Sequence, residues 1–384
     1  MESNGGKTVK IFISAGEASG DLHGARLARA LRSLAPGSRI TCLGGPQLEA
    51  AGAEVLADNR KLSVVGITEV FRHLKVILDA WKAIRRHLVQ DRPDIVVLID
   101  YPEFNIRLAR VARRLGIKVF YYIGPQVWAW RGGRVRTLKR LVDEMAVILP
   151  FEPAFYERRG MRVHFVGHPL LDVLRDAPSA REAGEKYRAL CARAVIGLLP
   201  GSRQSEVRAL LPLLLDTAEI LTKAVPGISF LIPVADALDS CPIEAEVARR
   251  GLSARIVSGD TYGAVRACDL VITASGTVTL ETAILGTPMI VTYRVSNFTY
   301  HSGRHLIKVE YVALPNLVAG RRIVPELLQA EAKPGLIARE ALSFLADPRK
   351  LEKQREDLAA IRLRLGREGV AERVASMVLK AVEP

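Results

Sequence analysis

The chain has 384 residues, of which 49% are hydrophobic and 6% aromatic, a composition typical of a globular α/β protein with two or three domains. No apolar run approaches the roughly 18 residues that a membrane-spanning helix needs, which argues against an integral membrane protein. The formal net charge of +14 favours an anionic partner, namely a nucleic acid, an acidic lipid or a phosphorylated substrate.

The cysteines and the first residues indicate a reducing compartment. The cysteines are scattered without a CxxC pair, so we expect free thiols: Cys42, Cys191, Cys241 and Cys268. The short apolar stretch after Lys10 is followed at once by Glu17 and Asp21, which argues against a signal peptide. We therefore expect residues 9–14 to form the first strand of a cytosolic protein.

Strands and helices alternate along the first half of the chain. Strands are predicted at 9–14, 40–43, 94–99, 118–123, 145–149 and 163–166, and helices at 22–34, within 64–89 and at 105–115. This alternation predicts a parallel sheet with right-handed crossovers. The helix within 64–89 has an apolar stripe with basic residues elsewhere, so it either packs on the sheet or lies on an anionic membrane.

Two turns that follow predicted strands are candidate site elements. The turn Gly16-x3-Gly20-Asp21 opens a helix but matches neither the dinucleotide fingerprint nor a Walker A loop, so it is either a weak phosphate site or a tight turn. Asp100 follows the strand at 94–99, and ligands of open α/β sheets gather at the carboxyl ends of strands. Its carboxylate is therefore either a general base or the N-cap of the next helix.

The positive charge is concentrated in one segment of this half. Between Phe104 and Arg140 there are ten basic residues and no acidic one, and Arg107, Arg110 and Arg114 share one helical face. This face is either solvated or binds an anion. Nucleic acid is the weaker candidate, because neither stacking aromatics nor a zinc-finger module accompanies the charge.

The alternation restarts after a stretch at 175–193 that is polar and helical in character and is typical of an interdomain linker. Strands are predicted at 194–199, 228–233, 255–257, 270–273 and 290–294, with a helix at 207–224 and mixed-charge helices from 334 to 380. The turn at 200–203 places the Arg203 guanidinium and backbone N–H groups at a helix start, which suits a diphosphate. The alternative is a surface arginine that caps its neighbours.

A second turn of this half, Ser275-Gly276-Thr277, joins a strand to a short helix that ends at Gly286. The N-terminus of such a helix is an anion site, and the carboxylate of Glu281 suits the hydroxyls of a ribose. Taken alone, an ordinary βα unit explains this stretch slightly better.

No metal site is predicted. The chain has no D-x-D pair and no His/Cys cluster with metal-ligand spacing. Four histidines are isolated, and such residues more often serve structure or hydrogen-bond a substrate: His23, His164, His168 and His301.

A series of motifs occurs in a fixed order: Ala15-Gly-Glu-Ala-Ser-Gly-Asp21, Ile99-Asp100-x-Pro-x-Phe-Asn105, Val127-Trp-Ala-Trp-Arg131, Leu149-Pro-Phe-Glu152, Leu199-Pro-Gly-Ser-Arg203, Ala274-Ser-Gly-Thr277, Leu314-Pro-Asn316-Leu and Pro325-Glu-Leu-Leu-Gln329. With this set the chain resembles the lipid-A-disaccharide synthases over about residues 11–330. Two departures concern the acceptor pocket. Gly124-Pro125-Gln126 stands where Ser-Pro-Ser is expected, and Tyr101 and Glu103 replace Ala and Asp.

The resemblance implies an inverting glycosyltransferase with the GT-B architecture, in which two Rossmann-like parallel-sheet α/β domains face each other across a cleft. The acceptor domain is expected at 1–180, the UDP-sugar donor domain at 181–345, and a helical tail at 346–384 that packs back on the N-terminal domain or on a partner chain. The implied reaction joins UDP-2,3-diacylglucosamine to 2,3-diacylglucosamine 1-phosphate (lipid X) at the cytosolic face of the inner membrane. No cofactor and no nucleic acid are expected, and a homodimer is left open.

The motifs and the resemblance together assign roles to individual residues. The catalytic residues are expected to be Asp100 as the base, Arg203 at the departing UDP, and Asn316. The donor site is expected to contain Gly201, Ser202, Ser275, Gly276, Thr277, Glu281, Glu326 and Gln329. The acceptor site is expected to contain Gly16, Glu17, Ser19, Asn105, Trp128 and Arg131, with Arg107 and Arg110 as further candidates for the acceptor phosphate.

Two alternatives stand beside this reading. An enzyme similar to UDP-N-acetylglucosamine 2-epimerase shares the two-domain design but needs no acylated acceptor. A non-catalytic nucleic-acid-binding protein would use the charge of +14 and bind in a salt-sensitive manner. The basic residues next to Asp100 argue against the second alternative, because they would serve one cleft.

Overall fold

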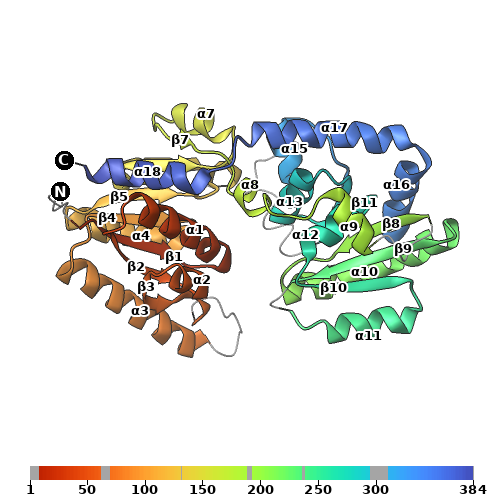
Figure 1. Ribbon diagram of the computed structural model, residues 1–384, viewed down its shortest axis with the longest axis horizontal. Helices are drawn as coiled ribbons and strands as arrows, with labels where there is room; N and C mark the ends of the chain where they lie inside the picture. The colour runs from red at the N-terminus through yellow and green to blue at the C-terminus, as the bar shows by residue number, and fades with distance from the viewer. Residues whose placement is uncertain are drawn as a thin grey trace, which may run out of the picture. The chain divides into compact units, whose positions relative to one another are not determined.

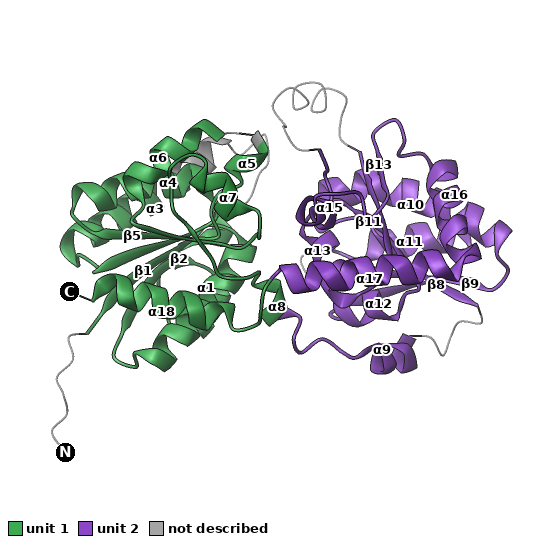
Figure 2. Cartoon of the chain, turned by 90° about the horizontal axis from the view of Figure 1, so that it is seen from above, with its two compact units in different colours: residues 1–172, 366–384 green, residues 173–365 purple. Residues whose placement is uncertain are grey.

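Two compact units make up the chain in the computed structural model, which describes residues 8–61, 70–130, 132–187, 193–235, 238–294 and 310–383. Unit 1 comprises Met1–Asp172 and Gly366–Pro384, and unit 2 comprises Val173–Leu365 (Figure 2). Each unit is a parallel sheet covered by helices (Figure 1). The predicted α/β class with two Rossmann-like units is therefore confirmed.

The described part of unit 1 contains a seven-stranded parallel sheet in the order β3-β2-β1-β4-β5-β6-β7. Its strands are β1 (Lys10–Ala15), β2 (Arg39–Gly44), β3 (Glu54–Asp58), β4 (Ile95–Ile99), β5 (Lys118–Tyr122), β6 (Glu144–Val147) and β7 (His164–Phe165). Every residue of β4 is a buried apolar side chain, as expected for a strand with helices on both faces. Ala15 of β1 pairs with Ile99 of β4, so Gly16 and Asp100 follow at the same sheet edge.

Helices cover both faces of this sheet. They are α1 (Ala18–Leu34), α2 (Pro46–Ala50), α3 (Val70–Gln90), α4 (Pro102–Arg114), α5 (Val127–Trp130), α6 (Val135–Leu141), α7 (Glu152–Glu157), α8 (Leu170–Val173) and α18 (Val370–Val382), with short 3-10 turns at Asn59–Lys61 and Gly132–Arg134. One core cluster joins β1 to α1 and α18, and the other joins the opposite face of the sheet to α3, α4 and α6. Alternating side chains of β1 enter the two clusters, since Ile11 and Ile13 belong to the first and Phe12 to the second.

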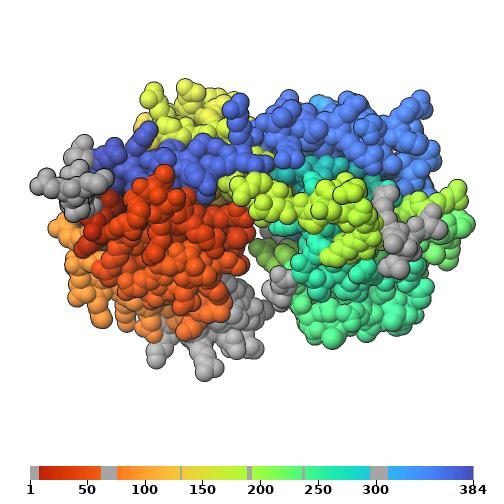
Figure 3. Space-filling view, viewed as in Figure 1, coloured from red at the N-terminus to blue at the C-terminus, as the bar shows by residue number. Residues whose placement is uncertain are grey.

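The last helix of the chain belongs to unit 1. In the space-filling view α18 lies beside the N-terminal part of the chain, and it packs against α1 (Figure 3). Asp172 holds the start of α18, because its carboxylate accepts hydrogen bonds from the backbone N–H groups of Gly369 at 2.6 Å, Val370 at 2.9 Å and Ala371 at 3.3 Å. Residues 346–365, by contrast, belong to unit 2.

The described part of unit 2 contains a six-stranded parallel sheet in the order β10-β9-β8-β11-β12-β13. Its strands are β8 (Ala194–Leu199), β9 (Ile228–Val234), β10 (Ala254–Ser258), β11 (Leu270–Ala274), β12 (Met289–Tyr293) and β13 (Glu326–Leu328). Its helices are α9 (Ala180–Tyr187), α10 (Gln204–Ala224), α11 (Cys241–Arg250), α12 (Thr261–Ala267), α13 (Thr277–Leu285), α15 (Leu314–Ala319), α16 (Pro334–Ala346) and α17 (Pro348–Arg364). A core cluster joins α10, α11 and α16 to one face of the sheet.

In both sheets the strand order reverses at one place. The chain proceeds outward in opposite directions from the neighbouring strands β1 and β4 of unit 1, and from β8 and β11 of unit 2. Such a reversal is a topological switch point, where the loops that follow the two strands diverge to opposite faces and leave room for a ligand. The candidate turns follow these four strands, at residues 16–21, 100–105, 200–203 and 275–277.

Several expectations differ from the structure or fall outside it. The stretch at 175–193 contains the helix α9, in agreement with its predicted helical character, whereas the short strands β3 and β13 were not predicted. Residues 64–69 of the predicted helix at 64–89 lie outside the described residues, as do Arg131, Cys191 and His301. Cys42, Cys241 and Cys268 are free thiols. No helix in the described ranges is long and apolar enough to cross a membrane.

Candidate functional site

Asp100 begins a strained turn at the carboxyl end of β4. Asp100 and Tyr101 have φ angles of +43° and +44°, in the left-handed region that residues other than glycine rarely adopt. Asn105 Nδ2 and the Tyr121 hydroxyl both donate hydrogen bonds to the Asp100 carbonyl oxygen, each at 2.7 Å. Ser14 Oγ in turn donates to Asn105 Oδ1 at 2.6 Å. These contacts hold the backbone in a conformation that is uncommon in general but frequent at functional sites.

Asn105 lies behind this turn and not on its surface. Its side chain is fully buried, and its amide also donates to the Ile99 carbonyl oxygen at 3.1 Å. Both the NH2 group and the carbonyl oxygen of the Asn105 amide are thus hydrogen-bonded to protein groups. This placement favours a positioning role for Asn105 over the predicted contact with the acceptor.

The surroundings of Asp100 raise the pKa of its carboxyl. Burial raises this pKa from 3.8 to about 6, the negative charge of Glu17 adds to the rise, and a hydrogen bond from the Tyr101 backbone N–H opposes it. A general base is most effective when its pKa lies near the working pH. The carboxyl of Asp100 therefore meets the electrostatic requirement for a base at neutral pH.

The pH dependence of turnover tests this assignment. A base accepts a proton only when it is ionised, so kcat/KM is expected to be constant well above pH 6 and to fall about tenfold per pH unit below the Asp100 pKa of about 6. The measurement is kcat/KM between about pH 5 and about pH 8, with each sample also returned to neutral pH to detect denaturation. A kcat/KM that stays constant down to about pH 5 would contradict the proposed effect of burial, because the pKa would then lie closer to its ordinary value of 3.8.

Gly16, at the tip of β1, lies directly against the Asp100 turn. A Cβ atom at this position would lie 2.1 Å from Cδ1 of Tyr101, well inside van der Waals contact. Only glycine allows the backbone to approach the ring so closely. The neighbouring residues Glu17 and Ser19, also predicted to contact the acceptor, are exposed.

The variant Gly16→Ala is expected to displace the Tyr101 ring and the adjoining Asp100 turn, and to lower kcat by about tenfold, because small misplacements of reacting groups slow catalysis strongly. The affinity for UDP should not change, since Gly16 belongs to unit 1 and the cavity described below to unit 2. Gly37→Ala is the matched control, because a Cβ there meets nothing within 4 Å. Wild-type turnover by a folded Gly16→Ala variant would show that the turn tolerates the displacement.

Of the other predicted acceptor residues, the structure describes Trp128, Arg107 and Arg110. Trp128 is half-buried and meets Phe151 edge-on, with 5.0 Å between ring centroids. Its buried indole N–H lies beside the Glu152 carboxylate without a hydrogen bond of good geometry to any described residue. The side chains of Arg107 and Arg110 are exposed on α4.

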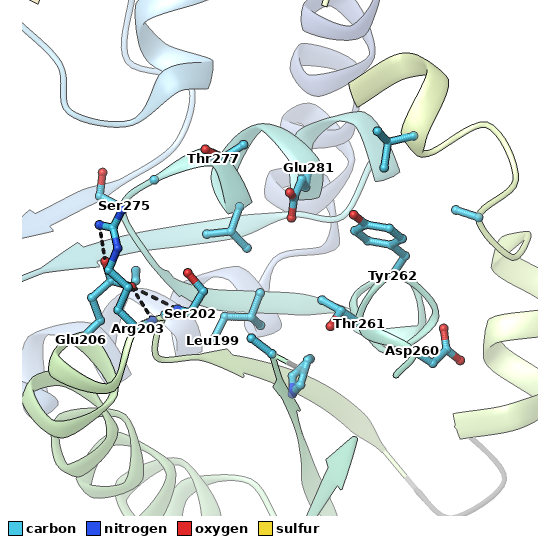
Figure 4. A pocket seen from close by; sticks show the side chains of 18 of the residues that line it. Leu199, Ser202, Arg203, Glu206, Asp260, Thr261, Tyr262, Ser275, Thr277 and Glu281 are labelled. Atoms are coloured by element: carbon cyan, nitrogen blue, oxygen red, sulfur yellow. Dashed lines mark hydrogen bonds and ion pairs between the residues drawn. The ribbon is translucent and has the colours of Figure 1, made fainter. Parts of the chain in front are cut away.

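Unit 2 contains a cavity of about 630 Å³ at the carboxyl ends of its strands (Figure 4). The lining comes from the turns after β8, β10 and β11 and from the segment that enters unit 2, and it includes Asp176, Pro178, Gly201, Ser202, Arg203, Glu206, Asp260, Tyr262, Ser275, Gly276, Thr277 and Glu281. Leu199 of β8 pairs with Thr273 of β11, so the two predicted turns lie side by side at one switch point. Volumes of this order are typical of small-molecule sites.

The carboxylate of Glu206, in the first turn of α10, is hydrogen-bonded to the backbone of the turn between β8 and α10. Glu206 Oε2 accepts hydrogen bonds from the backbone N–H groups of Ser202 at 3.0 Å and Arg203 at 3.2 Å. Glu206 Oε1 lies 3.4 Å from Nη1 of Arg203, whose side chain is 75% exposed. Two of the N–H groups that the sequence assigned to a diphosphate are therefore already bonded within the protein.

The turn between β11 and α13 is open by comparison. α13 has no acidic residue in its first turn and no side-chain cap, while Ser275 Oγ donates to the Val312 carbonyl oxygen at 3.3 Å. Glu281 points into the cavity (Figure 4), and burial raises the pKa of its carboxyl from 4.5 to about 7. A partly desolvated carboxyl in a cavity is well suited to bind hydroxyl groups.

Asn316 and Glu326 form a buried hydrogen-bonded pair. Asn316 Nδ2 donates to Glu326 Oε1 at 2.8 Å, and Asn316 Oδ1 accepts from the N–H groups of Ile323 and Val324 at 2.7 and 2.9 Å. Asn316 is fully buried, and Glu326 is 9% exposed. This placement favours a positioning role for Asn316 over the predicted catalytic one.

Glu326 connects this pair to the cavity wall. Its carboxylate accepts hydrogen bonds from the N–H groups of Val312 and Ala313, each at 3.0 Å. Ser275, which lines the cavity, donates to the carbonyl oxygen of the same Val312. A chain of hydrogen bonds through Val312 therefore links Glu326 to the cavity wall. Gln329, which directly follows β13, has a φ of +49° and its N–H donates to the Tyr293 carbonyl oxygen at 2.9 Å.

Two doubly wound units with candidate sites at their switch points define the GT-B class of sugar-nucleotide enzymes. Solved structures agree: S. aureus MnaA with UDP has a TM-score of 0.67 at 12% identity and covers 98% of this chain and 97% of its own. The glycosyltransferase of kitacinnamycin has a TM-score of 0.65 at 17% identity, covering 98% and 100%. UDP-GlcNAc 2-epimerase from Neisseria meningitidis has a TM-score of 0.64 at 12% identity, covering 97% and 100%. Identities this low establish the fold alone.

Sequence comparison then distinguishes among the members of this class. The family model described as lipid-A-disaccharide synthetase matches residues 11–381. The lipid-A-disaccharide synthase of Geobacter sulfurreducens is 47% identical over 371 residues, 97% of each chain. That of Syntrophus aciditrophicus is 46% identical over 374 residues, 97% of this chain and 98% of its own. The chain belongs to the lipid-A-disaccharide synthase family and is a glycosyltransferase.

The sequence reading missed several residues that shape these sites. Ser14 and Tyr121 support the Asp100 turn, and each is a polar group in the buried part of a mostly apolar strand. Glu206 follows Arg203 at the spacing of a capping box, which is a recognisable signal. Tyr262 lines the cavity from the first turn of α12, and no sequence signal marks it.

Proposed function

We propose that the protein is a lipid-A-disaccharide synthase. It transfers 2,3-diacylglucosamine from UDP to the 6-hydroxyl of 2,3-diacylglucosamine 1-phosphate with inversion, and the products are a β-1,6-linked tetraacyl disaccharide 1-phosphate and UDP. One observation carries the proposal: the family match spans residues 11–381 and therefore includes both the Asp100 turn and the cavity of unit 2.

The cavity of unit 2 is the proposed donor site. Glu281 binds the ribose hydroxyls, and the diphosphate lies against Ser275, Gly276 and Thr277 at the start of α13, where free backbone N–H groups and the helix dipole favour an anion. Arg203 supplies the guanidinium from the neighbouring turn. Gly201 and Ser202 shape the turn between β8 and α10. Glu326 and Gln329 support the wall of the cavity from behind its lining residues.

The proposed chemical step is a direct displacement. Asp100 removes the proton of the acceptor 6-hydroxyl while that oxygen bonds to the anomeric carbon and the bond from this carbon to UDP breaks. The electron pair of the broken bond leaves with UDP, and Arg203 with the start of α13 stabilises its negative charge. Inversion follows, because attack and departure take place on opposite faces of the sugar.

The acceptor and the membrane are assigned to unit 1. Glu17, Ser19 and Trp128 are the proposed contacts of the acceptor sugar, with Arg107 and Arg110 at its phosphate. Helix α3 exposes Leu78 and Val89, 48% and 51% respectively, among basic side chains. An exposed apolar and basic helix supports peripheral binding to the cytosolic face of the inner membrane, where both acylated substrates would reside.

The test is a reconstituted assay with UDP-2,3-diacylglucosamine and 2,3-diacylglucosamine 1-phosphate in detergent, measuring UDP release and disaccharide formation together. We expect both products in equal amounts and only when both substrates are present. Conversion of UDP-N-acetylglucosamine without an acylated acceptor would favour an epimerase instead. Salt-sensitive binding to DNA or RNA without UDP release would favour the nucleic-acid alternative.

A further inference from the structure

Glu206 occupies the place at the start of α10 where a helix commonly binds an anion. An ordinary capping box uses the N3 glutamate to accept a hydrogen bond from the N-cap N–H alone. Here Oε2 of Glu206 accepts from both Arg203 and Ser202, at 3.2 and 3.0 Å, and Oε1 contacts the Arg203 guanidinium at 3.4 Å (Figure 4). One carboxylate thus binds the same groups that a phosphate would bind.

The backbone is shaped around this carboxylate. Gly201 has a φ of +119°, and a Cβ atom at this position would lie 2.5 Å from Oε2 of Glu206. Glu206 also lines the cavity and its side chain remains 22% exposed. Its negative charge therefore faces the space proposed for the donor nucleotide.

The two helix starts at this cavity consequently differ. The first-turn N–H groups of a helix have no intrahelical acceptors. At α10, the carboxylate of Glu206 already binds the turn, whereas α13 has no acidic residue in its first turn and presents Thr277 and Val278 to the cavity. An anion that enters the cavity therefore finds N–H groups already bonded to a carboxylate before α10, and a first turn without an acidic residue at α13.

We propose that Glu206 is a positioning residue of the donor site, which excludes the UDP diphosphate from the backbone N–H groups of Ser202 and Arg203 and directs it to the start of α13 and to the guanidinium of Arg203. This inference rests on the proposed donor function of the cavity. Glu206 holds Arg203 at the cavity in the absence of nucleotide. Its charge also weakens the binding of UDP and so favours release of the product.

Titration calorimetry of the full-length protein with UDP tests the effect of the charge. Glu206→Gln keeps the length of the side chain and an oxygen that accepts from the two N–H groups, but it removes the charge. We expect Glu206→Gln to bind UDP about threefold to tenfold more tightly than the wild type, because a like charge near the diphosphate is lost. In steady-state assays its kcat should fall while inhibition by UDP becomes stronger. Glu219→Gln, on the same helix but away from the cavity, removes an equal charge and should bind UDP as the wild type does.

The outcomes separate this inference from the proposed function. A structural cap alone would leave UDP affinity unchanged or weaker in a folded Glu206→Gln variant, and that result would overturn the inference. A wild-type protein that does not bind UDP would overturn the proposed donor site itself. If Glu206→Gln does not fold, amide NMR shifts of the wild type decide: UDP should shift the Thr277 and Val278 amides more than those of Ser202 and Arg203, and the reverse order would contradict the inference.

Discussion

Asp100→Asn is expected to lower kcat by about a thousandfold, because the amide cannot accept the proton of the attacking hydroxyl. The affinity for UDP should stay at the wild-type value, since Asp100 lies in unit 1 and the described residues that line the proposed donor cavity all belong to unit 2. The measurement combines kcat for disaccharide formation with the Kd for UDP. Loss of turnover with normal UDP binding identifies a defect in the chemical step.

Two physical features make this variant informative about catalysis and not folding. Asp100 has a φ of +43°, and asparagine adopts the left-handed region more readily than most residues. Burial raises the pKa of Asp100 to about 6, so the folded state disfavours the ionised carboxylate, and a neutral amide removes this unfavourable charge at pH 7 and above. The melting temperature of Asp100→Asn should therefore equal or exceed that of the wild type.

Asp216→Asn provides the control for the change of charge, because Asp216 lies on α10 and does not line the cavity. It should retain wild-type kcat. If Asp100→Asn keeps more than about a tenth of the wild-type kcat, Asp100 is not the general base. A simultaneous loss of UDP affinity would instead indicate a wider structural defect.

The location of the candidate sites could be inferred from the sequence because it depends on local pattern. Strands end where apolar runs end, and parallel strands bring their carboxyl ends to one edge. This reasoning placed Asp100 after β4 and Arg203 after β8, and the structure puts both at switch points. Gly16 was predicted as a turn residue and, from the family resemblance, as part of the acceptor site, but its close approach to the Tyr101 ring depends on the tertiary structure and could not be inferred.

The direction in which a polar side chain points could not be inferred in the same way. Asn105 and Asn316 each belong to a short motif of the predicted sites, yet both are fully buried and bonded to protein groups. Whether an amide faces a ligand or a backbone carbonyl is decided by partners that are distant in sequence, such as Ser14 for Asn105. For Asn316 the partner Glu326 belongs to β13, a strand of only three residues that gives almost no periodic signal.

Arg203→Ala is expected to lower kcat/KM by about a hundredfold to a thousandfold, comparable to the loss of one main donor to a developing negative charge. The guanidinium is the one strongly cationic side chain among the described residues that line the cavity, so the helix start of α13 would have to stabilise the departing UDP alone. The affinity for UDP should fall as well, because the product carries the same diphosphate charge. The measurement is kcat/KM for the donor together with the Kd for UDP.

Arg203→Lys separates charge from geometry in this prediction. Lysine keeps the positive charge but cannot present two parallel N–H groups to a diphosphate, so we expect it to restore only part of the lost activity. Arg208→Ala removes an exposed arginine one turn further along α10 that does not line the cavity, and it should behave as the wild type. Equal losses in Arg203→Ala and Arg208→Ala would mean that any positive charge near the start of α10 is sufficient and that Arg203 has no specific contact. Full activity of Arg203→Ala would remove Arg203 from the donor site and leave the start of α13 as the sole anion site of the cavity.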